Sequence, residues 1–149
     1  MTVEGVPDWG EPSAAWWHAL AQQALDAAVA DDIPQVQAMF DELSRGGGVA
    51  FFAACCAWAG EYGTIVRRAL GDIDGAMVAL HMCDDEPLPT STRTAIQILA
   101  AVANDDLDTA AALWNAEISQ AGHESGVWVI RNVLAITAQT VGLAREEKL

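Results

Sequence analysis

Alanine-rich segments with helical periodicity, separated by short acidic or glycine-containing turns, make up most of this 149-residue sequence. Valine and isoleucine are scattered through them and do not alternate with polar residues, so the pattern favours helices over a sheet. Residues 31–45 are a clear example, because their apolar residues recur at three- and four-residue spacing. These residues are Ile33, Val36, Met39, Phe40 and Leu43. The sequence therefore predicts an all-α protein.

Signals for helix starts and ends divide the chain into about seven helices. Pro12 and Ser13 suit a first helical turn, three glycines from Gly46 end the second helix, and two prolines mark a loop around residues 83–92. The expected helices cover residues 12–30, 31–45, 49–70, a segment containing Ile73 and Leu80, 91–103, 107–121 and 125–142. Paired as antiparallel hairpins, they predict one domain of residues 12–142, between an N-terminal arm of residues 1–11 and a C-terminal tail of residues 143–149.

Three junctions between consecutive helices share one pattern: a small-residue helix, an aspartate followed by an aliphatic residue, and a second helix. They read AAVADDIPQVQAMF, RALGDIDGAMVAL and AAVANDDLDTAAALW. Their aspartates, Asp32, Asp72 and Asp106, are 40 and 34 residues apart, a period typical of helix-hairpin solenoids. With GDIDGA at Gly71–Ala76, this pattern over residues 17–122 resembles the tetratricopeptide family, although the family's Trp-Leu-Gly-Tyr pattern in the first helix is absent.

The resemblance implies an α-α superhelix whose first helices line a concave groove for a peptide or a partner's helix. By alignment the groove positions are His18, Ala21 and Leu25, then Trp58, Glu61, Ile65 and Arg68, then Thr92, Ala95 and Leu99. They are mostly apolar and lack the lysines and asparagines with which some family members grip a terminal carboxylate. In the alternative, the last helix, Gly126–Val141, fills the groove and the protein is a closed helical bundle.

Six tryptophans are many for a domain of this size. Trp58, Trp114 and Trp128 lie in apolar helical patterns, which predicts that they belong to the core. Trp16 and Trp17 are neighbours on a helix and cannot point the same way, so one is expected at a rim or an interface, where tryptophan is a recurrent binding anchor. The residues expected to bind a partner are Trp17, His18, Trp58, Glu61 and Arg68.

The charge is strongly one-sided, with 21 acidic residues against seven basic ones and a formal net charge of −14. Such a surface repels phosphate backbones, so direct nucleic-acid binding is not expected. Many aspartates fall at expected helix starts, where a carboxylate caps free amides. They are Asp31, Asp32, Asp72, Asp74, Asp105, Asp106 and Asp108. Capping thus explains much of the acidity, and the alternative is a partner with a basic surface or mimicry of nucleic acid.

The residues with reactive or metal-binding side chains do not assemble a recognisable catalytic or metal site. Cys55 and Cys56 are adjacent, so a disulfide between them is unnatural and their side chains diverge on a helix. They are expected to be packing residues. The fragment His81–Cys83 places its two ligand types two residues apart, which do not share a helix face. The sequence predicts no metal, no cofactor and no enzymatic activity.

The leading functional hypothesis is a small protein-interaction module that uses a helical-repeat groove or a homodimer surface. The alternatives are an acidic inhibitor or nucleic-acid mimic that binds a basic protein, as a mobile element might encode, and an enzyme or small-ligand sensor with a buried cavity. No secretory signal begins the chain, and the apolar run Val49–Gly60 is shorter than the roughly 20 residues of a membrane helix. A cytoplasmic location without membrane contact is therefore expected.

Overall fold

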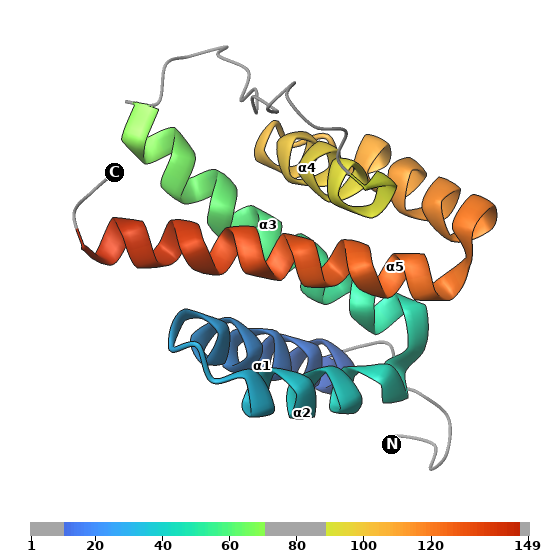
Figure 1. The fold of residues 1–149 in the computed structure, drawn as a ribbon, viewed down its shortest axis with the longest axis horizontal. Coiled ribbons are helices and arrows are strands. Elements are labelled where there is room, and N and C mark those ends of the chain that lie inside the picture. Colours follow the sequence, from blue (N-terminus) through green and yellow to red (C-terminus); the bar gives the residue numbers. More distant parts are fainter. Residues whose placement is uncertain (1–10, 71–88, 147–149) are drawn as a thin grey trace.

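The computed structural model describes residues 11–70 and 89–146. Its elements are α1 (Glu11–Val29), α2 (Ile33–Leu43), the short 3₁₀ helix η1 (Ser44–Gly46), α3 (Gly47–Leu70), α4 (Thr90–Ala103) and α5 (Leu107–Arg145). This part of the chain contains helices and turns and no strand, which confirms the all-α prediction (Figure 1).

The turns that join α1 to α2 and α4 to α5 have the same geometry. Asp31 and Asp105 have positive φ angles of 57° and 59°, a conformation that aspartate tolerates better than most residues. In both turns the next amide donates a hydrogen bond of 2.8 Å to the carbonyl oxygen five residues earlier. The carboxylates of Asp32 and Asp106 then accept a bond from the amide three residues later and cap the following helix. Two of the three junctions identified in the sequence thus fold alike, and the third lies outside the described residues.

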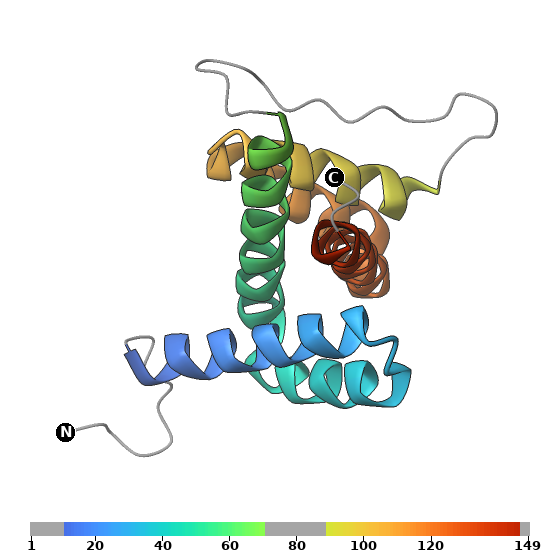
Figure 2. The ribbon, with the colours of Figure 1, turned by 90° about the vertical axis from the view of Figure 1, so that its left-hand side faces the viewer.

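α3 crosses the molecule and packs against α1, α4 and α5. Figure 2 shows it running from the level of the α1–α2 hairpin to the level of α4. A close approach makes the crossing with α4 tight, because a Cβ atom on Gly63 would lie 3.0 Å from the Cα atom of Ala103. The Arg67 side chain donates from Nε to the Ala103 carbonyl oxygen at 2.8 Å, which satisfies an otherwise free acceptor at the end of α4.

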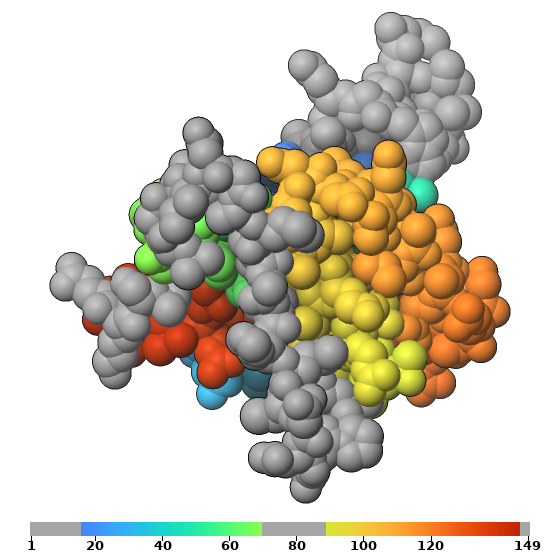
Figure 3. All heavy atoms as spheres, turned by 90° about the horizontal axis from the view of Figure 1, so that it is seen from above, coloured from blue at the N-terminus to red at the C-terminus, as the bar shows by residue number. Residues whose placement is uncertain are grey.

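α5 contains a kink that folds it back on itself. Gly122 has φ 86° and ψ 174°, a backbone region essentially restricted to glycine. The first half of α5 lies beside α4, as the view from above also shows (Figure 3). The second half runs between the α1–α2 hairpin and α4 (Figures 1 and 2). The halves pack closely at Gly126, where a Cβ atom would meet the Trp114 ring at 3.1 Å.

The core is centred on the second half of α5 and the middle of α3. Val129, Ile130 and Val133 are fully buried. Trp58 of α3 is 1% exposed, and its indole Nε1 donates to the Ala21 carbonyl oxygen of α1 at 2.8 Å. Its ring stacks against Phe40, with ring centroids 6.1 Å apart. Buried apolar contacts of this kind supply most of the stability of a helical domain.

The structure differs from the sequence prediction in the number of helices. The described residues form five α-helices, because the expected helices at 107–121 and 125–142 join across the Gly122 kink into α5. The fourth expected helix, around Ile73, falls outside the described residues. α5 also continues to Arg145, into the segment expected as a tail.

The open superhelix implied by the tetratricopeptide resemblance is not supported. α5 packs against α1, α3 and α4, so the expected concave side is covered. The groove positions Ala21, Leu25, Trp58, Ala95 and Leu99 are all buried. In helix-hairpin repeats such positions stay open only when no later segment packs over them. Here the chain turns back at the Gly122 kink, and the second half of α5 packs over the expected groove.

Candidate functional site

Trp58, one of the residues expected to bind a partner, is a core residue. Its 1% exposure and its hydrogen bond to Ala21 place the indole between α1 and α3, and Thr137 of α5 donates to the Trp58 carbonyl oxygen at 3.4 Å. A side chain that is 1% exposed reaches a partner only if the bundle opens. The role of Trp58 in this structure is packing.

Trp17 and His18, two other residues expected to bind a partner, come together at a hollow on the surface. The hollow has a volume of about 140 Å³ and lies between α1 and α3. Its lining consists of Trp17, His18, Ala21, Ala53 and Ala57. Trp17 is half-buried, as is Trp16, and His18 is exposed. Of the paired tryptophans, Trp17 lines the hollow and Trp16 does not.

A larger hollow of about 490 Å³ adjoins the first one at Ala53. It lies between the start of α3 and the first half of α5, and it is lined by Gly48, Val49, Phe52, Ala53, Ala111, Trp114, Asn115 and Ile118. The two hollows together are called the α3 surface. Val49 is 57% exposed, and Phe52 stacks on Trp114 with centroids 5.9 Å apart. Among the described residues, no aspartate, glutamate, lysine or arginine lines either hollow.

Glu61 and Arg68 continue along α3 beyond the smaller hollow. Spacings of four and seven residues place Ala57, Glu61 and Arg68 along one stripe of the helix. Both charged side chains are exposed. The structure thus brings Trp17 and His18 together at a hollow, places Glu61 and Arg68 farther along the same helix face, and buries Trp58.

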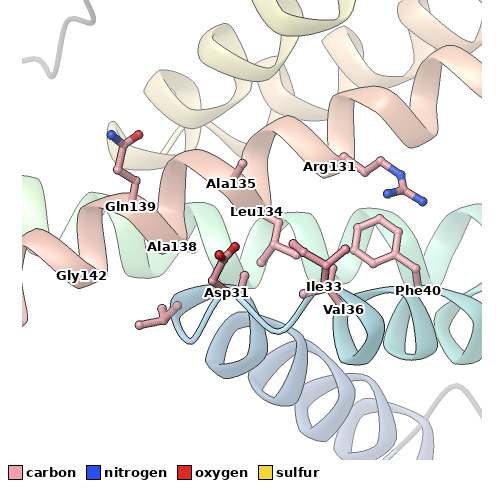
Figure 4. A pocket seen from close by; sticks show the side chains of 12 residues that line it. Asp31, Ile33, Val36, Phe40, Arg131, Leu134, Ala135, Ala138, Gln139 and Gly142 are labelled. Atoms are coloured by element: carbon pink, nitrogen blue, oxygen red, sulfur yellow. The ribbon is translucent and has the colours of Figure 1, made fainter.

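A second concave region lies between α2 and the second half of α5, and is called the α2–α5 groove. Its volume is about 450 Å³. Figure 4 shows Val36 and Phe40 of α2 facing Leu134 of α5 across it. The remaining lining residues are Ala28, Val29, Asp31, Ile33, Arg131, Ala135, Ala138, Gln139 and Gly142. Ile33 is 63% exposed, so an apolar edge of the groove faces solvent.

Arg131 is held above an aromatic ring at one end of this groove. The carbon at the centre of its guanidinium lies 5.0 Å from the Phe40 ring centroid and 5.8 Å from that of Trp128, distances at which a cation is attracted to a ring face. Its Nη2 atom donates to the Gln37 side-chain oxygen at 2.8 Å. Trp128, expected in the core, is 54% exposed and covers the outer side of this arginine.

A buried glutamate links α4 to both halves of α5. Glu117 is 5% exposed. The Thr94 hydroxyl of α4 donates to its Oε1 atom at 2.6 Å, and the Ser125 hydroxyl, beyond the kink, donates to Oε2. Both carboxyl oxygens therefore have partners within the protein, so this group acts as a structural connection across the kink.

The two thiols within the described residues, those of Cys55 and Cys56, lie in surroundings that disfavour reaction. Cys55 is fully buried, and burial raises the pKa of its thiol far above the ordinary value, with a smaller contribution from Cys56. Burial also raises the pKa of the Cys56 thiol. A raised pKa lowers the fraction of the nucleophilic thiolate at neutral pH. Within residues 11–70 and 89–146, no group of three or more His, Cys, Asp or Glu side chains is arranged to hold a metal ion.

Sequence reasoning did not single out Val49, Phe52, Ile33 and Arg131, which line the larger hollow of the α3 surface and the α2–α5 groove. Val49 and Ile33 follow the helical apolar pattern, and nothing in the periodicity distinguishes an exposed member of such a pattern from a buried one. The sequence did contain a signal for Arg131, because this residue follows Trp128 by three positions and is the one charged residue in the segment 126–142. That spacing places a cation beside an aromatic ring on one helix face.

Two stretches, Ile33–Ala69 and Leu107–Arg145, are long and apolar enough to cross a membrane by length and composition. Length and composition are weak evidence for a membrane-spanning helix, because the core helices of soluble proteins pass the same test. In the structure the first stretch is interrupted by η1 and the second is kinked at Gly122.

The geometry therefore defines a kinked, all-helical bundle with an uncharged α3 surface and a separate groove that carries one arginine. Comparisons with protein-family models, with curated proteins and with solved structures found no match.

Proposed function

We propose that this chain is a small protein-interaction module whose α3 surface binds an apolar segment of a partner protein. The observation that carries the proposal is the contrast between an uncharged, largely apolar lining and a chain with a net charge of −14. Contiguous apolar surface on an otherwise polar protein typically marks an interaction site. Exposed Val49 and half-buried Trp17 and Phe52 give this surface the apolar and aromatic side chains from which interface centres are built.

The proposed partner segment is an amphipathic helix with basic residues beside its apolar stripe. Two adjoining hollows, of about 490 and 140 Å³, can take apolar side chains from neighbouring turns of such a helix. Basic flanks complement the acidic surface of the module and speed association. A second copy of the chain is a poorer occupant, because two molecules of net charge −14 repel each other.

The proposal is of a binding protein and assigns no catalytic step. We further propose a cytoplasmic location, in which Cys55 and Cys56 remain reduced. A tetratricopeptide-like origin of the hairpins also stays a proposal, supported by the matching turns at Asp31 and Asp105.

The test replaces one exposed apolar residue in the α3 surface and one outside it. Val49→Asp introduces a charge into the larger hollow, and Leu107→Asp is its control, since Leu107 is 56% exposed and lines neither hollow. We expect both variants to keep the melting temperature of the parent chain. Val49→Asp should weaken binding to an affinity-captured and then purified partner about tenfold or more, because truncating or charging an interface centre costs roughly 1.4 kcal/mol or more. Equal binding by both variants would contradict the proposal.

Salt dependence separates this function from the alternative of an acidic inhibitor or nucleic-acid mimic. Raising the ionic strength from about 0.1 M to about 1 M shortens the Debye length from about 10 Å to about 3 Å. Apolar docking should then survive with a slower association rate, whereas a complex held by charge should be lost. Sedimentation of the free chain at the same two ionic strengths measures self-association. If the parent chain dimerises and Val49→Asp does not, the occupant of the α3 surface is a second copy of the chain and not the proposed partner.

A further inference from the structure

The α2–α5 groove combines a mostly apolar lining with a cation at one end. Val36, Phe40, Leu134 and Ala138 line it, and Arg131 borders it beside Phe40 (Figure 4). Its volume of about 450 Å³ lies within the range of about 300–1,000 Å³ that is typical of small-molecule sites. None of these residues belongs to the α3 surface, so a ligand in this groove is independent of the proposed function.

Arg131 is oriented and retains hydrogen-bonding capacity. Its guanidinium lies over the Phe40 and Trp128 rings, and Gln37 accepts one hydrogen bond from Nη2, so three side chains hold it in place. A guanidinium carries five donors. Among the described residues, no carboxylate forms an ion pair with Arg131, although acidic residues outnumber basic ones by 21 to seven. An arginine fixed in this way presents the planar fork that recognises a carboxylate by two parallel hydrogen bonds.

We propose that the α2–α5 groove binds an aliphatic monocarboxylate of the fatty-acid class. Its carboxylate pairs with Arg131, and its hydrocarbon chain lies between α2 and α5 against Val36, Leu134 and Ala138. The polarity of the groove fixes this direction, because Asp31 lines it on the side away from Arg131 and would repel a carboxylate there (Figure 4). The charge of Arg131 thus selects an anionic head group, and the apolar lining of the groove selects a hydrocarbon chain.

The binding test uses the full chain and sodium dodecanoate below its micellar concentration, at neutral pH, with isothermal titration calorimetry. We expect saturable binding at one site per chain. Arg131→Gln should weaken it about ten- to a hundredfold, because a hydrogen-bonded charged pair is lost. Arg93→Gln is the matched control, since Arg93 is exposed on α4 and does not line the groove. It should bind dodecanoate as the parent chain does.

Two further measurements keep the proposal falsifiable if Arg131→Gln loses stability. Ala135→Trp places a ring in the groove from an exposed position and should abolish binding while leaving the melting temperature unchanged. In the parent chain, 1-dodecanol and dodecylamine should bind at least tenfold more weakly than dodecanoate. No dodecanoate binding, equal affinity for dodecanol, or full affinity in Ala135→Trp would each overturn the proposal. Val49→Asp should bind dodecanoate normally, so failure of the α3 surface and failure of this groove are distinguishable.

Discussion

At the scale of single residues, the aspartates of this chain have two structural roles that a count of charges does not separate. Asp32 and Asp106 cap helices through their carboxylates, whereas Asp31 and Asp105 occupy the positive-φ position that reverses the chain. Part of the acidity is therefore required by the turns. This explains why acidity alone is a weak argument for nucleic-acid mimicry.

The cap at Asp106 makes the stability of the protein depend on pH in a defined direction. Hydrogen bonds from the Thr109 hydroxyl and amide lower the pKa of the Asp106 carboxyl below its ordinary value. Its stabilising contribution is therefore complete above the unfolded-state pKa, near about 4, and is lost as pH falls through the lower folded value. Asp106→Asn keeps a hydrogen-bond acceptor but does not titrate. The free energy of unfolding of this variant, measured by urea denaturation, should therefore change less between pH 5 and pH 2 than that of the parent chain. An identical pH profile for both proteins would show that this cap is not coupled to folding.

At the scale of elements, the break in α5 determines where the last segment packs. A continuous helix of 39 residues would carry residues 123–145 away from the bundle, whereas the Gly122 kink returns them across α3. The Glu117 carboxylate then joins Thr94 to Ser125 across the kink, and Gly126 allows Trp114 to approach. Backbone conformation, a polar connection and a small residue thus favour the same arrangement.

Replacing Gly122 by alanine isolates the backbone contribution. A Cβ atom at this position would meet nothing within 4 Å, so no steric clash accompanies the substitution. The φ of 86° and ψ of 174° nevertheless cost a non-glycine residue about 1–3 kcal/mol. We expect Gly122→Ala to lower the free energy of unfolding by that amount in urea denaturation. Gly142→Ala, also without a neighbour within 4 Å but at an ordinary helical φ, should be neutral or slightly stabilising. If the two substitutions had equal effects, the kink would carry no strain.

At the scale of the whole molecule, the sequence was sufficient for fold class and insufficient for topology. Helical periodicity and the aspartate junctions placed the described helices and two turns nearly correctly, because these signals are local. The path of the chain after Gly122 depends on tertiary packing. A glycine between two helical patterns is compatible with the boundary between two repeats and also with a turn that sends the last helix back across the earlier ones. The candidate sites could be predicted only in part for the same reason. Trp17 and His18 line a surface hollow, whereas Trp58 is buried and Trp128 is exposed, since periodicity identifies an apolar face but not what covers it.

Because the last segment packs back across the earlier helices, the effect of removing it distinguishes a closed bundle from a repeat array. In an array each unit contacts only its neighbours, so removal of a terminal element leaves the remaining units folded. Here the last segment supplies Val129, Ile130, Val133 and Thr137, all fully buried against other helices. A chain that ends at Ala121 should therefore lose its cooperative thermal transition and its near-ultraviolet circular dichroism. A chain that ends at Arg145 is the control and should keep both. A cooperative transition in the shorter chain would mean that the first four helices and half of α5 form an independent core, and the bundle would then have to be described as an array with a docked helix.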